Sequence, residues 1–369
     1  MTTKDAPVFA LVTGGGTGGH VYPAIAVAQE LVRRGHPKES VYFVGAQRGL
    51  EATAVPAAGF TIDLLPGRGI RRSLRPAALR DNVSALFGAC RAFTKAFRLV
   101  GRVRPRVVFG VGGFASLPCV VAARLRRVPA VVHEQNAAPG LANRIGVRLG
   151  ARPAVSIPGT RLRGAVVTGN PIRPEISAVT RALAAPPLVA VFGGSLGAQR
   201  LNDSAVALAA LWRDRDDIEV LLVTGRRDHE RSSARLRAVR GPEDRLPFQV
   251  VAYEEHMEGV YARSALVVSR AGAVTVAELA ATGTPALLVP LPGAPHDHQT
   301  RNAETLVAAG AAVLVPDGEL DGVRLAAAVD ELLVDQGQLA AMSSAARSLA
   351  RPDAAQRVAD LVEEVARAA

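Results

Sequence analysis

Two distant stretches of this sequence open in the same way. "FALVTGGGTGGHV" begins at Phe9 and "LVAVFGGSLGAQR" begins at Leu188, and each is an apolar run followed by a glycine turn and a helical pattern. A strand that enters a helix through a glycine turn is the opening unit of a doubly wound α/β domain. A single core rarely grows beyond roughly 250–300 residues. We therefore expect this chain of 369 residues to fold into two such domains.

Short β-branched runs alternate with helical patterns along the chain, which is typical of parallel sheets. The expected strands are 8–13, 41–44, 60–65, 107–110, 130–133, 166–168, 188–192, 218–224, 248–252, 266–269, 286–289 and 312–315. Residues 169–187 contain four prolines and no sheet pattern, so they are expected to be an interdomain linker. The expected domains are then 1–168 and 188–350, and a C-terminal helix at 351–369 is expected to pack back on the first domain.

Composition excludes several classes of protein. With 49% hydrophobic and 21% charged residues, the chain is compact and globular rather than disordered. Its N-terminus does not have the pattern of a signal sequence, and no apolar run approaches the roughly 18 residues of a membrane span. A cytoplasmic location is therefore expected. The two cysteines, Cys90 and Cys119, predict neither a disulfide scaffold nor a metal site.

The positive charge is concentrated in one stretch. The formal net charge is +11, and residues 68–106 contain 11 basic residues and one acid, Asp81. Apolar residues at helical spacing predict that much of this stretch is a helix with a core face. "GRGIRRSLRP", residues 67–76, combines arginines with Ile70 and Leu74 and is expected to be exposed. We expect it to dock on an anionic membrane surface. Nucleic acid is not an expected partner, because no recognition motif accompanies the charge.

The glycine turns predict phosphate sites, because the backbone can approach a ligand and the next helix presents free N–H groups. Residues 14–19 are not a Walker A motif, since His20 and Val21 occupy the places of the lysine and the Ser/Thr. They match G-x-G-x-x-G, but no acid for the ribose of NAD follows Gly45 at the end of the second strand. NAD is therefore not expected, and Arg48 leaves NADP as a weaker alternative.

Two clusters have some features of a metal site. Asp214 and Asp216 have the spacing of a metal-binding pair, but they precede a strand and so are expected at the wrong end of the sheet, in a solvated loop. His296 and His298 are too closely spaced, and no third ligand cluster completes them. We expect no metal site and no cofactor.

Five motifs occur in order along the chain: "GGTGGHVYPA" (15–24), "HEQN" (133–136), "GNPIR" (169–173), "GGSLGA" (193–198) and "SRAGAVTVAE" (269–278). Their order and spacing resemble the MurG family of N-acetylglucosaminyltransferases of peptidoglycan synthesis, from about Val8 to the C-terminal tail. The resemblance implies a GT-B fold, with two Rossmann-like doubly wound domains that face a central cleft. It implies that UDP-N-acetylglucosamine binds to the second domain and the lipid-linked acceptor, lipid I, to the first. The implied reaction is an inverting transfer to the muramoyl 4-hydroxyl of lipid I that gives lipid II, without a metal at the nucleotide.

Two residues are candidates for the catalytic base. His20 is at a helix N-terminus, where the helix dipole disfavours the imidazolium and keeps a neutral base. Its alternative role is to hydrogen-bond and shape the loop. Glu134, at the end of a strand, is the other candidate, as a base or as an orienting residue.

The resemblance also implies a set of substrate contacts. Thr17, Gly18 and Gly19 correspond to contacts with the donor sugar and phosphate, and Asn136 to an amide that touches the transferred sugar. An ordinary turn is the alternative for Asn136. Arg173 is expected to reach the pyrophosphate or the sugar with its guanidinium, and Ser195 to reach the pyrophosphate with its hydroxyl and backbone N–H.

Nucleotide contacts are implied in the second domain. Tyr253 corresponds to an aromatic residue packed on uracil, and the Glu254 backbone to a group that reads the base edge. A core tyrosine is the alternative for Tyr253. A turn into a helix is formed by Gly272, Ala273, Val274, Thr275, Val276 and Ala277. Glu278 is expected to accept both ribose hydroxyls, and Gln299, or His298 by a shift of one residue, to contact the donor sugar.

The implied partners are the two substrates, the anionic inner surface of the cell membrane and the cell-wall and division machinery. The implied location is peripheral, on the cytoplasmic face of the membrane. Two other functions stay open at this point. One is an isomerase similar to UDP-N-acetylglucosamine 2-epimerases, and the other is a non-catalytic nucleotide-sugar-binding protein.

Overall fold

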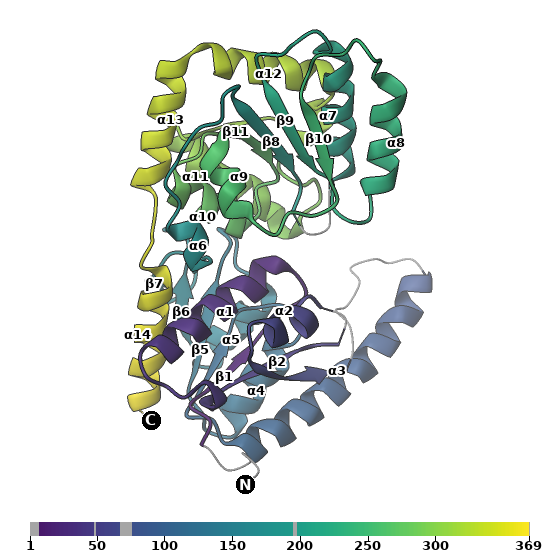
Figure 1. Cartoon of the computed structure of the whole chain (residues 1–369). Helices are drawn as coiled ribbons and strands as arrows, with labels where there is room; N and C mark the ends of the chain where they lie inside the picture. Colours follow the sequence, from purple (N-terminus) through teal and green to yellow (C-terminus); the bar gives the residue numbers. More distant parts are fainter. Residues whose placement is uncertain (1–6, 48, 67–75, 195–197, 369) are drawn as a thin grey trace. The chain divides into compact units, whose positions relative to one another are not determined.

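The computed structural model describes residues 7–47, 49–66, 76–194 and 198–368. The chain forms two compact units (Figure 1). Unit 1 contains Met1–Ile172 and Asp353–Ala369, and unit 2 contains Arg173–Pro352. The expected linker is therefore divided, with 169–172 in unit 1 and 173–187 in unit 2. The Arg181 guanidinium fixes the second part, because it donates to the carbonyls of Gly283 and Ser264, both at 2.6 Å.

Unit 1 is built on a parallel sheet of seven strands in the order β3-β2-β1-β4-β5-β6-β7. Its strands are β1 (Ala10–Thr13), β2 (Val41–Ala46), β3 (Thr61–Leu65), β4 (Val107–Gly110), β5 (Ala130–Glu134), β6 (Arg152–Val155) and β7 (Val166–Val167). Its helices are α1 (Gly18–Arg33), η1 (Lys38–Ser40), α2 (Glu51–Ala57), α3 (Pro76–Val103), α4 (Ser116–Leu125), α5 (Leu141–Arg148) and α14 (Ala354–Arg367).

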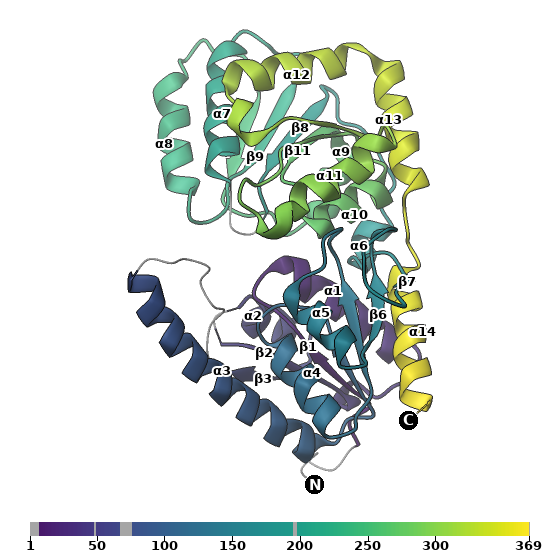
Figure 2. The ribbon, with the colours of Figure 1, turned by 180° about the vertical axis from the view of Figure 1, so that it is seen from behind.

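The central strands β1 and β4 of unit 1 are buried on both faces. In β1, Ala10 and Val12 pack in a cluster with residues of α1, α2 and α14. Leu11, which points to the other face, packs in a cluster with residues of α3 and α4. This burial on both faces explains why the strands are short apolar runs without polar alternation. Figure 2 shows α4 and α5 on the side of the sheet away from α1.

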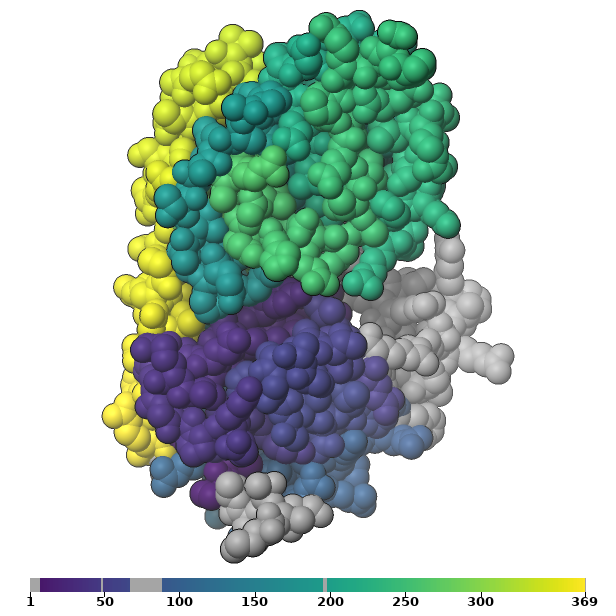
Figure 3. Space-filling model, viewed as in Figure 1, coloured from purple at the N-terminus to yellow at the C-terminus, as the bar shows by residue number. Residues whose placement is uncertain are grey.

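The last helix of the chain, α14, is part of unit 1. Val358 and Val362 are buried in the same cluster as Val27 of α1. Arg34, directly after α1, forms ion pairs with Asp360 at 2.6 Å and with Glu363 at 3.2 Å. Figure 3 shows α14, in yellow, lying against the purple residues of α1.

Unit 2 is built on a parallel sheet of six strands in the order β10-β9-β8-β11-β12-β13. Its strands are β8 (Leu188–Phe192), β9 (Glu219–Val223), β10 (Phe248–Val251), β11 (Ser264–Ser269), β12 (Ala286–Leu288) and β13 (Ala312–Leu314). Its helices are α6 (Pro174–Ser177), α7 (Gln199–Leu211), α8 (His229–Val239), α9 (Met257–Arg263), α10 (Ala273–Thr282), η2 (Pro295–Asp297), α11 (His298–Ala308), η3 (Asp317–Glu319), α12 (Gly322–Val334) and α13 (Gln336–Ser348). One core cluster joins β8, β9 and β11 to α7 and α12.

The strand order reverses once in each sheet. The two switch points lie between β1 and β4 in unit 1 and between β8 and β11 in unit 2. Ligands of open α/β sheets bind outside the carboxyl ends of the strands at such points. Glycine turns follow all four of these strands, at Gly14, Gly112, Gly193 and Gly272. The topology therefore gives each unit one place for a ligand.

One strand of the structure is absent from the pattern read in the sequence. Strand β6 was not predicted, because it contains Pro153 and begins at the exposed Arg152. It nevertheless pairs with β5 and β7, with Ala154 opposite Val166. Asp216 lies before β9, as expected, and its exposed side chain pairs with Arg245 at 2.9 Å. In the part of the chain that the structure describes, no helix is long and apolar enough to cross a membrane.

Candidate active site

Two glycine turns at the switch point of unit 1 are in direct backbone contact. Strand β1 pairs with β4 so that Thr13 lies opposite Gly110, which brings together the turns that follow. Gly113 has a φ of +80°, and a Cβ there would lie 2.3 Å from the carbonyl oxygen of Gly15. A side chain at residue 113 would therefore separate the turns. This contact requires glycine at this position.

His20 lies between these turns, in the first turn of α1. Its Nδ1 is 3.3 Å from the Thr17 hydroxyl. A Cβ on Gly112, whose φ is +88°, would lie 3.2 Å from both Nε2 and Cδ2 of His20, so the imidazole packs on the backbone of Gly112. When the Nδ1 proton is donated to Thr17, Nε2 keeps its lone pair and can accept a proton. This arrangement fits a general base.

Glu134 is held by four donors. Its side chain is 2% exposed. Oε1 accepts from the backbone N–H and side-chain amide of Asn136 at 3.1 and 3.2 Å. Oε2 accepts from Gly140 N–H and Asn143 Nδ2, both at 2.8 Å. A carboxylate offers about four lone-pair sites, so this geometry supports the orienting role of Glu134 rather than the base role. It also fixes Asn136, which was predicted to touch the transferred sugar.

The other two residues of "HEQN" form a buried support that sequence reasoning missed. His133 is fully buried, and its Nε2 is 3.0 Å from the Gly169 carbonyl oxygen. The Gln135 amide donates to His133 Nδ1 at 3.1 Å and to the Val111 carbonyl at 3.1 Å. Burial lowers the pKa of His133 to about 4. The neutral ring therefore links the "HEQN" loop to the "GNPIR" segment and to the turn after β4.

This burial predicts a pH-dependent stability. The unfolded chain binds a proton at His133 with a pKa of 6.5 and the folded chain with a pKa of about 4. Stability is therefore highest above pH 6.5 and decreases as the pH falls toward 4, by about 2 kcal/mol at pH 5 from this residue alone. Urea unfolding at pH 7.5 and pH 5.0 measures the change. We expect His133→Gln to reduce the difference between the two pH values, whereas an unchanged difference would contradict the prediction.

The switch point of unit 2 presents a helix N-terminus. Helix α10 begins after Gly272, which has an extended conformation, and no side chain caps the helix. Its first turn closes through the hydrogen bond from Val276 N–H to the Gly272 carbonyl at 2.9 Å. The N–H groups of residues 273–275 precede that bond and have no intrahelical acceptor. The predicted turn from Gly272 to Ala277 therefore has the geometry of an anion site.

Glu278 lies in the second turn of α10, with a residue exposure of 7%. Its Oε2 accepts from the Tyr261 hydroxyl at 2.9 Å. The Arg173 guanidinium is 3.7 Å from its Oε1, so these two predicted site residues are brought together. Burial raises the pKa of Glu278, and the charge of Arg173 opposes that shift. A buried carboxylate with two fixed neighbours has a defined orientation, which suits recognition of a diol.

Two further residues support the turn before α10, and sequence reasoning missed both. The Arg270 guanidinium donates to the carbonyls of Val289 and Pro290 at 3.0 and 3.1 Å, and it pairs with Asp317 at 2.6 Å. Asn302, fully buried on α11, donates to the Ala271 carbonyl at 3.1 Å. The only sequence signal was the position of Arg270 inside the "SRAG" motif.

The predicted nucleotide contacts lie after β10 and before α11. Tyr253 is 41% exposed, which argues against a core tyrosine, and the Arg226 guanidinium lies 5.2 Å from its ring centre. Glu254 uses its side chain locally, because Oε1 accepts from His256 N–H at 2.7 Å. Gln299 Oε1 accepts from Leu291 N–H, and His298 Nδ1 lies near the Pro295 carbonyl oxygen, both at 2.9 Å. Ser195 lies outside the described residues.

Unit 1 thus pairs Thr17 with His20 and Glu134 with Asn136, and unit 2 brings together Arg173, Glu278 and the start of α10. Two doubly wound units with these sites define the class of glycosyltransferases with the GT-B fold. The model of the glycosyltransferase family 28 N-terminal domain matches residues 10–154, and that of the C-terminal domain matches residues 188–358. The chain belongs to the MurG family within this group.

Several known proteins document this membership. A UDP-N-acetylglucosamine–N-acetylmuramyl-(pentapeptide) pyrophosphoryl-undecaprenol N-acetylglucosamine transferase of Alkalilimnicola ehrlichii is 43% identical, over 97% of this chain and 99% of its own length. The protein of the same name from Desulforudis audaxviator is 38% identical, over 96% and 98%. The crystal structure of Acinetobacter baumannii MurG has a TM-score of 0.75 and 30% identity, and the match covers 97% of this chain and 100% of that one.

The epimerase alternative is represented among the solved structures. A putative UDP-N-acetylglucosamine 2-epimerase from Listeria monocytogenes has a TM-score of 0.66, and the match covers 97% of this chain and 96% of that one. Its sequence identity is 14%. This likeness establishes a shared fold alone, and the curated relatives favour the transferase.

Proposed function

We propose that this chain transfers N-acetylglucosamine from UDP-N-acetylglucosamine to the muramoyl 4-hydroxyl of undecaprenyl-pyrophosphoryl-N-acetylmuramoyl-pentapeptide, lipid I, and so makes lipid II. The observation that carries the proposal is the 43% identity to a transferase of this name over nearly the full length of both chains. Such a transfer requires a base for the acceptor hydroxyl and groups that stabilise the departing diphosphate. The position of His20 in unit 1 fits the first requirement, and the anion site at the start of α10 in unit 2 fits the second.

The reaction is a direct displacement at the anomeric carbon. His20 Nε2 takes the proton of the acceptor hydroxyl as the oxygen forms a bond to C1 of the sugar. The bond between C1 and the UDP oxygen breaks, and the electron pair leaves with UDP, so the anomeric configuration inverts. The N–H groups at the start of α10 and the Arg173 guanidinium stabilise the charge that develops on the diphosphate. Ser195, predicted to contact the same diphosphate, completes this group.

The remaining site residues position the donor. Tyr253 packs on the uracil, and the Glu254 backbone reads its edge. Glu278 accepts the ribose hydroxyls. Asn136, fixed by Glu134, and Gln299 contact the transferred sugar, and Thr17, Gly18 and Gly19 contact the donor sugar and phosphate.

The experiment that tests this proposal traces a label in the N-acetylglucosamine group. The protein is incubated with UDP-N-acetylglucosamine labelled in the sugar, with and without a lipid I analogue. Label that enters the lipid fraction only when the acceptor is present supports the transferase. A labelled 2-epimer formed from the donor alone would instead indicate the isomerase. Donor binding without any turnover would indicate a nucleotide-sugar-binding protein.

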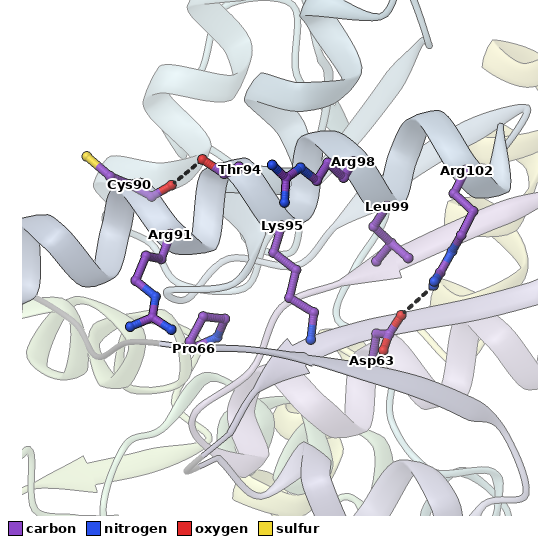
Figure 4. Close-up of a pocket in the computed structure, with 9 residues that line it drawn as sticks. All are labelled: Asp63, Pro66, Cys90, Arg91, Thr94, Lys95, Arg98, Leu99 and Arg102. Carbon is purple, nitrogen blue, oxygen red and sulfur yellow. Dashed lines mark hydrogen bonds and ion pairs between the residues drawn. The ribbon is translucent and has the colours of Figure 1, made fainter.

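The acceptor is lipid-linked, so we propose peripheral docking on the anionic membrane surface. Of the segment first predicted for this role, residues 67–76, the part 67–75 lies outside the described residues. Its continuation along α3 lines a cavity of about 670 Å³ with Arg91, Lys95, Arg98 and Arg102 (Figure 4). Asp63 pairs with Arg102 at 3.0 Å, and no other carboxylate of the described residues pairs with the four cations. This row of four basic side chains attracts lipid phosphates.

Neutralising this row is expected to weaken membrane binding. Each basic residue near an anionic leaflet contributes about 1 kcal/mol, so Arg91→Gln, Lys95→Gln and Arg98→Gln together should reduce binding about 100-fold. Flotation with vesicles that contain phosphatidylglycerol measures the change, and high salt should reduce wild-type binding. The matched control changes Arg144, Arg148 and Arg152, three exposed arginines of unit 1, to glutamine. Equal losses in the two variants, or wild-type binding that does not depend on anionic lipid, would contradict the docking surface.

A further inference from the structure

A buried carboxylate lies inside the first glycine turn. Glu51, the first residue of α2, is 2% exposed. Its Oε2 accepts from the backbone N–H of Gly16 at 2.8 Å, and its Oε1 accepts from that of Ala46 at 2.7 Å. These are the lengths of charge-assisted hydrogen bonds. The two donors belong to neighbouring strand ends, because β1 and β2 pair with Thr13 opposite Val44.

Three glycines make room for this carboxylate. A Cβ on Gly15 would lie 2.0 Å from Oε1, one on Gly49 would lie 2.0 Å from Oε2, and one on Gly45 would lie 2.3 Å from the Glu51 Cγ. The glycines of this region therefore enclose a side chain of the protein itself. This differs from a nucleotide-binding turn, in which the space is kept for a ligand.

The acid and the first glycine turn are arranged differently in this protein and in a dinucleotide-binding site. In a dinucleotide site, the amides of the first turn receive the phosphate, and an acid at the end of the second strand binds the ribose. Here the acid follows the second strand by a few residues, and its carboxylate enters the turn. The Glu51 carboxylate accepts the hydrogen bond of the Gly16 N–H. Among the described residues, no hydrogen bond is found from the N–H of Gly18 or from that of Gly19.

We propose that Glu51 is a built-in anion that occupies the phosphate position of the first glycine turn. It has two effects. It keeps a nucleotide phosphate from the N–H of Gly16, and it fixes the turn that leads from Gly16 to Thr17 and His20. Glu51 is thus a positioning residue for the base and a specificity-determining residue for the acceptor side. The effects on the base and on the acceptor rest on the proposed function, whereas the binding of the Glu51 carboxylate in the glycine turn does not.

The test uses Glu51→Ala, which removes a CH₂–COO⁻ group, the size of one acetate ion. We expect turnover to fall about 100-fold, because small displacements of catalytic groups have effects of this size. The KM for the lipid acceptor should rise, whereas the Kd of UDP, which binds in unit 2, should not change. Added acetate should restore turnover with saturation, and acetamide or chloride should not.

Hydrogen exchange of residues 14–19 provides a readout independent of the reaction. The Gly16 amide should be protected in the wild type, exchange faster in Glu51→Ala, and regain protection with acetate. If the protein does not catalyse the proposed transfer but the Gly16 amide shows this exchange pattern, the binding of Glu51 in the turn remains supported and its role in turnover does not. If transfer occurs but exchange and turnover do not respond to Glu51→Ala, the inference is overturned.

Two variants complete the design. Glu51→Gln keeps the volume but turns an NH₂ group toward one of the two N–H donors, so we expect a loss of turnover that acetate does not reverse. This variant decides the matter if Glu51→Ala does not fold, because wild-type kinetics in Glu51→Gln would contradict the role of the charge. The control is Glu39→Ala, an exposed acid of the same unit, which should keep full turnover and show no response to acetate. A Glu51→Ala protein that loses turnover without any rescue by acetate would show that the side chain serves packing only.

Discussion

Replacing His20 by alanine is expected to lower kcat by about 10² to 10⁴-fold, the usual contribution of a general base. The Kd of UDP should stay the same, because the proposed contacts with uracil and ribose lie in unit 2. The physical reason is the position of the imidazole, which packs on Gly112 with Nδ1 at 3.3 Å from the Thr17 hydroxyl. Single-turnover kinetics with a lipid I analogue, together with calorimetric titration of UDP, measure the two quantities.

Two further variants sharpen this result. Thr17→Val removes the hydroxyl that lies 3.3 Å from His20 Nδ1 and should give a smaller loss of kcat, with a changed pH dependence, because the tautomer is no longer selected. His36→Gln changes a histidine of the same unit whose partner is Glu363, and it should keep full turnover. A His20→Ala enzyme with normal kcat would return His20 to the role of a loop-shaping residue and would leave the reaction without its base.

Replacing Glu278 by alanine is expected to raise the KM for UDP-N-acetylglucosamine by at least about 100-fold. The two hydrogen bonds proposed from the ribose hydroxyls to the carboxylate would be lost, and each contributes about 1.5–3 kcal/mol. The change also removes the partner of the Tyr261 hydroxyl, which donates to Glu278 at 2.9 Å. The KM for the acceptor should not change. Steady-state kinetics with each substrate varied in turn separate the two effects.

Glu278→Gln distinguishes the ribose contact from packing. The amide oxygen can still accept from Tyr261, so the fold of unit 2 should be preserved, while the charge beside Arg173 is lost. We expect a loss of donor affinity smaller than that of the alanine variant. Glu304→Ala, an exposed acid on α11, is the matched control. An unchanged donor Kd in both Glu278 variants would remove Glu278 from the donor site.

The sequence pattern was most accurate where strands are buried on both faces. Strands β4 and β8 have the predicted bounds, because apolar residues fill each of them and glycine or proline marks their ends. Strand β6 was missed because Pro153 interrupts its short run. It is a strand through pairing with its neighbours, and that information is not local.

The residues of the candidate site also fall into two groups, those that local sequence predicts and those that only the folded structure identifies. His20 and the start of α10 could be predicted from glycine turns, because a strand, a glycine turn and a helix have one local geometry. Glu51 could not, because its role depends on the register that places the end of β2 beside the turn after β1. The role of Glu134 was left between base and orienting residue, and only the count of its four donors favours one of them. The hydrogen-bond donors around a side chain can be counted only in the folded structure.

The position of α14 has a consequence for how the protein is made. Val358 and Val362 complete a core whose other members include Val27 and residues of β1, yet the whole of unit 2 lies between them in the sequence. A ribosome must therefore synthesise unit 2 before unit 1 can close its core. Unit 1 then folds late, although it is begun first, and depends on contacts of very high sequence separation. A chain that stops before Asp353 would leave the apolar surface of α1 exposed to chaperones and to aggregation.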